Sequence, residues 1–247
     1  MPILGSGLIT HSSSFNVLTL SGLLAWYDAQ DAATVYTDSG LTALATANGT
    51  DTVGGWKDKS GNNSHALQAT SGKRPIYFNN AIGGKNAIKA DGVDDFLGTS
   101  SIAHGIGTGD FYIACVLNRH TTQTGYRDAV ALASGNPGVY VRNDTTDKLT
   151  SYLGSKRQFD TALALSTNYV VELWRSSSSL FAAVNAAQEA TSFGSVTTSI
   201  ATSIYALFAS SSATEFAAIY LAEVIITKTM PTSRAAVAAY LKSRYGI

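Results

Sequence analysis

Short apolar segments separated by loops of Gly, Asn, Asp and Ser restrict the fold of this chain more than any other feature of its sequence. The pattern is densest between Trp26 and Leu97, where aromatic or aliphatic pieces alternate with loops such as Gly61–Asn63. These loop residues adopt the backbone angles that tight turns need, so each loop lets the chain reverse direction. Half-buried strands joined by such turns are typical of a β-sandwich.

The same spacing continues along most of the chain. Early strand candidates are Phe15–Leu20, Leu23–Asp28, Ile76–Phe78 and Ala87–Ala90, with Gly83-Gly84 as the hairpin turn between the last two. Later candidates are Phe111–Leu117, Ala129–Ala133, Gly138–Arg142, Leu149–Leu153, Tyr169–Trp174, Leu180–Val184, Ser203–Phe208 and Phe216–Thr227. Strands at such intervals predict one antiparallel sandwich over residues 15–247. Residues 1–14 are small and polar, and they predict a flexible N-terminal arm.

In the C-terminal segment the spacing of the apolar residues changes from that of a strand to that of a helix. Val237, Leu241 and Tyr245 recur every four residues, which places them on one face of a helix. Thr232 or Ser233 can cap the first free N–H groups of that helix. The sequence therefore predicts a helix at residues 232–245 that packs on the sandwich.

Composition and charge exclude several classes of partner. Charged residues make up 14% of the chain, and 17 basic and 17 acidic residues give a formal net charge of zero. Because a nucleic-acid groove needs clustered positive charge, we expect no nucleic-acid partner. No apolar run is long enough to span a membrane, so we expect no membrane partner. The neutral, hydroxyl-rich composition suits an extracellular or particle-bound protein.

The single cysteine and residues 1–14 indicate in which cellular compartment the protein is made. Cys115 lies in an apolar segment, so a buried thiol is expected, and one cysteine cannot form an intrachain disulfide. No Cys/His spacing suggests zinc. Residues 1–14 lack the basic start and the unbroken apolar core of a signal peptide, so we expect synthesis in a host cytoplasm without export by that route.

Six segments carry a family resemblance. They are Ala25–Asp28, Trp56–Gly61, Arg74-Pro75, Asp91–Asp95, Leu221–Ile226 and Val237–Gly246. In this order they resemble the concanavalin A-like, laminin G-like jelly-roll family, in the form found in phage structural proteins and bacterial surface proteins. The resemblance covers most of residues 20–247 and implies an all-β, antiparallel jelly-roll β-sandwich with a short C-terminal α-helix. That fold carries lectins, glycan hydrolases and structural modules alike, so it implies no single activity.

The loop that contains Trp56, Asp58, Asn62 and Asn63 is the candidate glycan site. In a lectin, a sugar would stack on the tryptophan while the aspartate and asparagines bind its hydroxyl groups. The alternative, which ordinary turn chemistry favours, is a core tryptophan beside an Asx turn at Asp58–Asn63.

Asp91, Asp94 and Asp95 are the densest carboxylates of the chain and the candidate metal site. Carboxylate oxygens suit calcium, which takes six to eight oxygen ligands. The alternative is that Asp91 makes a tight turn with Gly92 and that the other two residues begin the next strand. We expect no cofactor other than such a calcium ion.

The sequence predicts no catalytic residues. Glycan hydrolases on this fold resemble one another in a Glu-x-Asp-x-Glu strand, and Glu172, Glu189, Glu215 and Glu223 do not lie in that pattern. Glu223 lies inside an apolar run, which is typical of a partnered structural carboxylate. The four histidines have no serine or cysteine signature nearby. We therefore predict a protein that is not an enzyme.

Resemblance, composition and the expected lack of an export signal together favour a virion structural protein of a phage-like particle: a head decoration, a fibre or a tail-associated surface protein. Residues 1–14 would then dock the chain to other virion proteins of the capsid or tail, and a homo-oligomer is expected. The alternative is a glycan-binding adhesion module that recognises a host surface polysaccharide.

Overall fold

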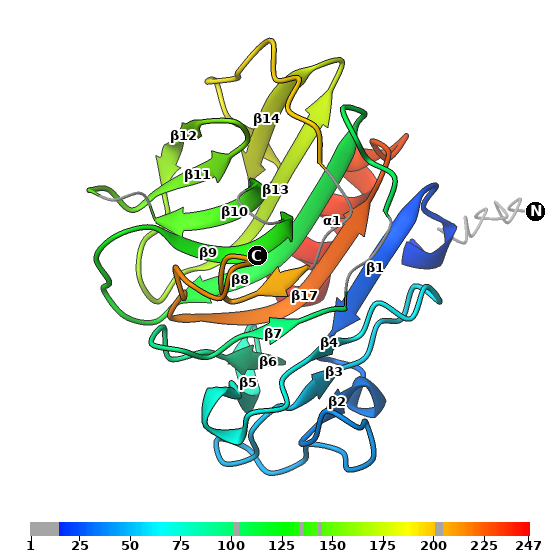
Figure 1. The fold of residues 1–247 in the computed structure, drawn as a ribbon, viewed down its shortest axis with the longest axis vertical. Helices are drawn as coiled ribbons and strands as arrows, with labels where there is room; N and C mark the ends of the chain where they lie inside the picture. Colours follow the sequence, from blue (N-terminus) through cyan, green and yellow to red (C-terminus); the bar gives the residue numbers. More distant parts are fainter. Residues whose placement is uncertain (1–14, 101–103, 134–135, 143–144, 201–204) are drawn as a thin grey trace, which may run out of the picture.

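The computed structural model describes residues 15–100, 104–133, 136–142, 145–200 and 205–247 (Figure 1). Two antiparallel sheets, A and B, stack face to face, and one C-terminal helix, α1, lies behind sheet A in this view. The predicted all-β sandwich with a C-terminal helix is therefore confirmed. The predicted arm, residues 1–14, lies outside the described residues.

Sheet A has the strand order β15-β14-β13-β8-β17-β6-β5, and β1 also pairs with β17. Its strands are β1 (Leu23–Asp28), β5 (Ile76–Ile82), β6 (Lys85–Lys89), β8 (Phe111–Arg119), β13 (Asn168–Ser176), β14 (Ser179–Val184), β15 (Ala187–Gln188) and β17 (Ile219–Thr227). Every residue of β8 is buried, because its inner face meets sheet B and its outer face meets the helix. This double burial explains why the sequence of β8 is a nearly continuous apolar run.

Sheet B has the strand order β12-β11-β10-β9-β16-β7-β4-β3-β2. Its strands are β2 (Val35–Tyr36), β3 (Gly55–Trp56), β4 (Ala66–Leu67), β7 (Leu97–Gly98), β9 (Arg127–Ala133), β10 (Asn136–Arg142), β11 (Lys148–Tyr152), β12 (Lys156–Ala162) and β16 (Ala206–Leu207). Val139 and Val141 of β10 belong to the core between the sheets, whereas Tyr140 does not. Since successive strand side chains point to opposite faces, Tyr140 lies on the outer face of sheet B.

The helix α1 (Arg234–Tyr245) buries Val237, Leu241 and Tyr245 against the outer face of sheet A, as their spacing predicted. It begins two residues later than expected, after Ser233, whose side chain makes no capping hydrogen bond. Gly246 follows in the left-handed region, and its N–H donates to the Lys242 carbonyl.

A buried polar network ties the helix to sheet A. Glu223 of β17 accepts hydrogen bonds from Trp26 Nε1 at 2.8 Å and from the Tyr245 hydroxyl at 3.0 Å. Arg244 lies 3.3 Å from Glu223 and 3.0 Å from Asp28. Burial, with Asp28 adding to it, raises the pKa of Glu223 to about 7. Glu223 is therefore a partnered structural carboxylate, as its apolar surroundings in the sequence predicted.

Two local predictions had different outcomes. Gly83 and Gly84 both have positive φ and form the turn between β5 and β6, as expected. The predicted strand Phe15–Leu20 is wrong: residues Val17–Thr19 form a 3-10 turn (η1), because the Asn16 side chain accepts a hydrogen bond from the Leu18 N–H at 3.0 Å. The remaining short 3-10 turns of the described chain are η2 (Ala32–Thr34) and η3 (Ser71–Lys73). No described helix is long and apolar enough to cross a membrane.

Candidate functional site

The aromatic residue of the predicted glycan loop lies in the core. Trp56 is 0% exposed, and its ring packs 5.6 Å from the ring of Tyr27. A sugar cannot stack on a ring that presents no face to solvent. Asn63 is exposed and has a φ of 56°, which makes it a turn residue. The structure thus corresponds to the alternative of a core tryptophan beside a turn.

The polar residues of this loop satisfy the free edge of β1. Asp58 is buried and accepts hydrogen bonds from the backbone N–H groups of Trp26 at 2.9 Å and Ser64 at 3.0 Å. The Asn62 side-chain amide donates to the Leu23 carbonyl at 2.9 Å. An unpaired strand edge leaves N–H and C=O groups that need partners, and this loop supplies them. These side chains are therefore used in folding.

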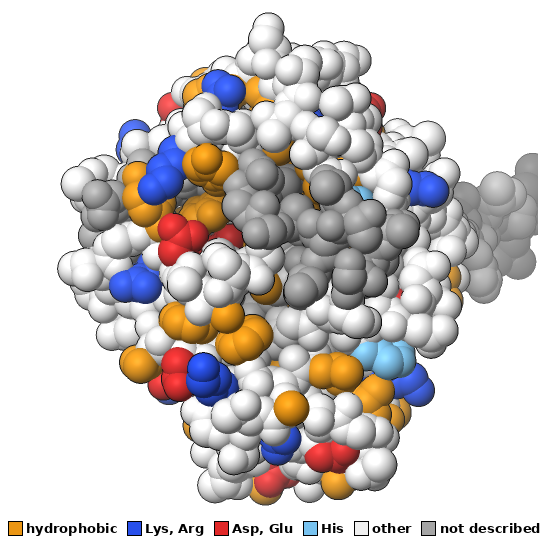
Figure 2. Space-filling model, viewed as in Figure 1, with side chains coloured by type: hydrophobic (Ala, Val, Ile, Leu, Met, Phe, Trp, Pro, Cys, Tyr) orange, Lys and Arg blue, Asp and Glu red, His pale blue; other side chains and the backbone are white. Residues whose placement is uncertain are grey.

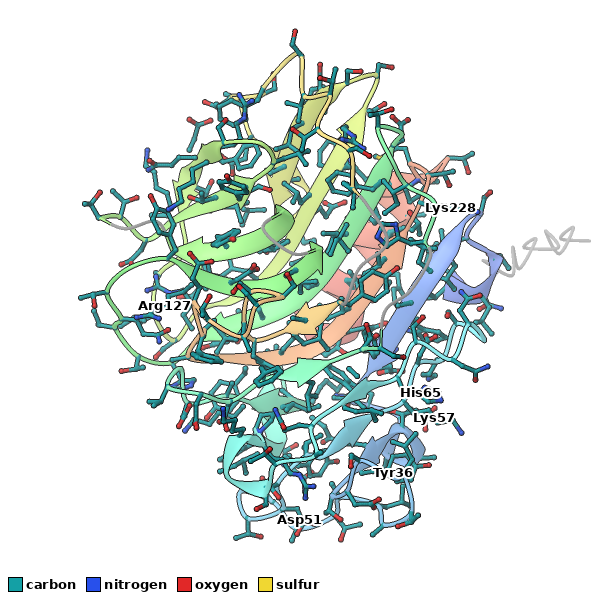
Figure 3. All side chains as sticks on the ribbon, viewed as in Figure 1. Tyr36, Asp51, Lys57, His65, Arg127 and Lys228 are labelled. Carbon is teal, nitrogen blue, oxygen red and sulfur yellow. The ribbon has the colours of Figure 1, made fainter. Side chains whose placement is uncertain are left out.

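A cleft of about 650 Å³ adjoins the loop. Its polar wall is formed by Ser60, Asn62, Ser64, His104 and Lys228, and its apolar wall by Leu18, Leu20, Leu23 and Leu24. His104 is stacked on Tyr205, and no Trp, Tyr or Phe ring is among the described residues that line the cleft. Figure 3 places Lys228 and His65 on this side of the molecule, away from Arg127.

The three aspartates of the candidate metal site do converge. Ligand oxygens of Asp91, Asp94 and Asp95 lie within 4.8 Å of one another. Burial, with the charges of the other two aspartates adding to it, raises the pKa of Asp95 to about 6. Asp91 also accepts a hydrogen bond from the Val93 N–H at 2.8 Å, which is the turn contact of the alternative interpretation. With one ligand oxygen each, the three carboxylates supply three of the six to eight oxygens that calcium takes, so calcium binding stays a prediction.

A different set of residues forms a pocket on the outer face of sheet B. Tyr140 of β10, Tyr152 of β11, Lys156 of β12 and Glu215 line a hollow of about 170 Å³, which we call the outer-face pocket. Tyr152 pairs with Lys156 across β11 and β12, so both side chains share one face of the sheet. Figure 2 shows hydrophobic, basic and acidic side chains side by side over these strands, on the left of the view.

Aromatic rings and an amine adjoin one another here. The ring of Tyr126 lies 6.3 Å from that of Tyr140, at an interplanar angle of 90°. Lys156 Nζ lies 2.9 Å from the centroid of the Tyr126 ring. A ring face attracts a cation, so this contact holds the amine beside the pocket.

A carboxylate completes the pocket. The Tyr140 hydroxyl donates to Glu215 Oε2 at 3.2 Å. Burial, together with the charges of Asp128 and Glu215, raises the pKa of Tyr140, so its hydroxyl keeps its proton. Glu215 has a φ of 55°, a conformation that non-glycine residues rarely adopt. Strained backbone of this kind is concentrated at functional sites.

No protein-family model matches the chain, and no curated protein does so either. Solved structures do match. The Trypanosoma rangeli sialidase matches at a TM-score of 0.61 and 13% identity over 92% of this chain, which spans only 33% of the sialidase chain. Domain 4 of AbnA, a GH43 extracellular arabinanase from Geobacillus stearothermophilus, was solved in complex with arabinotriose; it matches at 0.57 and 11% identity, over 90% of this chain and 98% of that domain.

The binding domain of Paraclostridial Mosquitocidal Protein 1 matches at a TM-score of 0.59 and 10% identity, over 91% of this chain and 52% of that one. Identities this low establish the fold alone. The chain therefore shares an antiparallel β-sandwich fold with these structures, as its resemblance implied.

Proposed function

We propose that this chain is a carbohydrate-binding module and that it binds glycan at the outer-face pocket. The observation that carries the proposal is the meeting of Tyr140, Tyr152, Lys156 and Glu215 in one hollow. The partly exposed ring of Tyr152 offers an apolar face to the C–H groups of a sugar, while a carboxylate accepts from its hydroxyl groups and an amine donates to them. A few convergent polar groups beside aromatic rings are what orient a small ligand.

The structural matches support this proposal. The arabinanase domain that the chain covers almost completely was solved with a bound oligosaccharide. The chain corresponds to about a third of the sialidase, so the activity of that whole enzyme does not transfer to it.

The raised pKa of Tyr140 favours glycan binding over glycan cleavage at this pocket. Some sialidases use a tyrosine nucleophile, and Tyr140 does contact a glutamate. A nucleophilic phenol needs surroundings that ease loss of its proton. The neighbouring carboxyl groups instead raise the pKa of Tyr140. Tyr140 is thus suited to hold a ligand and not to attack it.

A place on a virion surface is compatible with such a module but gains no support from these matches. It stays a prediction, and so do docking to other virion proteins and a homo-oligomer. Mass-spectrometric detection of the chain in purified particles, and its mass in solution, would test them.

Calorimetric titration tests the glycan proposal directly, with arabinotriose and free sialic acid as first probes and a glycan array to extend them. Tyr152→Ala should weaken binding about fivefold or more, because one aromatic contact is worth about 1 kcal/mol. Tyr36→Ala is the matched control, since β2 lies at the opposite end of sheet B. Equal losses in both variants, or silence of the folded protein across the array, would refute the proposal.

A further inference from the structure

A buried aspartate lies beneath the outer-face pocket. Asp128 is on β9, opposite Tyr140 of β10 in the sheet register, and it is 1% exposed. Its backbone N–H donates to the Glu215 carbonyl at 2.9 Å, and Asp128 also forms a β-bridge with Phe216. One residue therefore touches both the strand and the loop that supply the pocket.

The space around the Asp128 carboxyl is provided by a glycine. A Cβ at Gly138 would lie 2.7 Å from both carboxylate oxygens, so only glycine at this position leaves room for the carboxyl group. Within the described part of the chain, the Oδ1 atom has no hydrogen-bond partner. A buried polar atom without a partner is costly, so its presence in a folded protein calls for an explanation.

The charge state of Asp128 follows from its surroundings. On the pocket side it lies near Glu215 and Tyr140, and its charge also acts on the buried Cys115 thiol of sheet A. The adjacent Arg127 directs its Nη1 to the Phe216 carbonyl at 3.3 Å. Burial first, and then the charge of Glu215, raises the pKa of Asp128 well above its ordinary value. Its carboxyl group therefore keeps its proton to a higher pH than an ordinary aspartate does.

Two ionised carboxylates could not share this space. If Asp128 lost its proton, its charge would repel Glu215, which already has an unfavourable backbone conformation. Glu215 and the Tyr140 hydroxyl bonded to it would then shift. The positions of Glu215 and Tyr140, which line the pocket, thus depend on the Asp128 carboxyl group, which lies beneath it.

We propose that Asp128 is the positioning residue of the outer-face pocket: its buried carboxyl group, seated on Gly138, holds Glu215 and Tyr140 in the geometry that binds glycan. This inference rests on the proposed function. Its first test therefore uses the ligand-free protein, so that the role of Asp128 is decided separately from glycan binding. Glycan affinity should be constant while Asp128 keeps its proton and should fall when the proton leaves. An amide at position 128 should remove that fall.

The first test is an NMR titration of the ligand-free protein, with ¹³C at aspartate carboxyl carbons and tyrosine rings. The aspartate carboxyl signal that is present in the wild-type spectrum and absent from the Asp128→Asn spectrum belongs to Asp128. It should change at a higher pH than the signals of the exposed aspartates do. The Tyr140 ring should shift with it in the wild type and stay still in Asp128→Asn. An ordinary acidic titration of Asp128, or a Tyr140 ring that ignores it, would overturn the inference whether or not any glycan binds.

The second test measures arabinotriose affinity by calorimetry from about pH 6 to about pH 9. The wild type should lose about fivefold or more in affinity as Asp128 ionises, since the lost contact is one polar hydrogen bond. Asp128→Asn should keep the affinity seen at low pH across the range, whereas Asp128→Ala should bind weakly throughout. Asp160→Asn, at an exposed aspartate of β12, should follow the wild type.

A pH profile that persists in Asp128→Asn would contradict the positioning role. So would a folded Asp128→Asn protein that no longer binds. If the wild type binds no arabinotriose at any pH, the glycan proposal fails for this sugar, while the NMR titration still decides the role of Asp128.

Discussion

The outer faces of sheet A and sheet B each carry a tyrosine hydrogen-bonded to a glutamate, but only the pair on sheet A lies under a helix. On sheet A the Tyr112 hydroxyl donates to Glu172 at 2.8 Å, and Arg234 of α1 bonds the same carboxylate at 2.8 Å. On sheet B the Tyr140 hydroxyl donates to Glu215 beside an open pocket. The same chemical pair is a structural contact where a helix supplies a cation and closes the surface. It is a candidate binding contact where the surface stays open.

The largest effect on stability should come from removing the ion pairs between α1 and the outer face of sheet A. Arg244→Ala leaves the buried carboxylate of Glu223 without its cation, while Asp28 keeps its ion pair with Lys59 at 2.8 Å; the free energy of unfolding should fall by about 4 kcal/mol. Urea denaturation at neutral pH measures this change. Lys242→Ala, two residues earlier on the same helix, should cost far less. Glycan affinity of the folded Arg244→Ala protein should be unchanged; if affinity falls as well, the two faces are not independent.

The next effect is a pH dependence of stability on the same side. The folded-state pKa of Glu223, about 7, lies above its unfolded value, so between these values the native state holds a proton that the unfolded chain releases. The free energy of unfolding should therefore fall as pH rises from about 4.5 to about 7, by about 3 kcal/mol for the full shift.

Glu223→Gln should flatten most of this slope in thermal unfolding measured across that range. A smaller slope that ends near pH 6 should remain and should disappear in Asp95→Asn, because the pKa of Asp95 is raised to about 6. Stability that instead rises steadily from pH 5 to pH 7 would show that Glu223 is ionised in the native state.

Removing one tyrosine hydroxyl group from each sheet's outer face compares the two faces directly. Tyr140→Phe removes the hydroxyl that faces the pocket and should weaken glycan binding about fivefold, the value of one hydrogen bond of about 1 kcal/mol. Tyr112→Phe removes the equivalent hydroxyl under the helix and should lower stability by a similar energy while leaving affinity intact. Calorimetry and urea denaturation of both variants test this. The comparison fails if the two substitutions change affinity equally.

The smallest expected effect concerns calcium. If Asp91, Asp94 and Asp95 bind the ion weakly, millimolar calcium should stabilise the protein by about 1 kcal/mol or less, and Asp94→Asn should remove that gain. Thermal unfolding in calcium chloride, against sodium chloride of equal ionic strength, measures it. Equal melting temperatures in the two salts would assign the three aspartates to the turn alone.

Local sequence predicted much of the fold. The apolar run that begins at Phe111 became the central strand of sheet A, although the strand continues through Asn118 and Arg119. Both polar residues are buried because they have partners far along the chain: Asn168 for the first and Asp147 for the second. Apolar periodicity cannot report such partners, so the prediction ended two residues early.

The candidate site was predicted less well than the fold. The polar loop after Trp56 has the composition of a sugar site, yet Asp58 and Asn62 use their hydrogen bonds on the edge of β1. Tyr140 and Tyr152 lie within the predicted strands Gly138–Arg142 and Leu149–Leu153 but had no assigned role, and neither had Glu215. The alternation Val139-Tyr140-Val141 does place Tyr140 away from the core. Nothing local connects it to a glutamate 75 residues away.

By itself, the sequence determined what depends on near neighbours: strands that alternate between buried and outward residues, glycine turns such as Gly83-Gly84, and a terminal helix with one apolar face. Only the tertiary structure decided which sheet face the helix covers, which polar groups are already bonded, and which distant residues line a pocket. The physical reason is that backbone periodicity is fixed by local geometry, whereas burial and the pairing of charges depend on contacts between segments far apart in the chain.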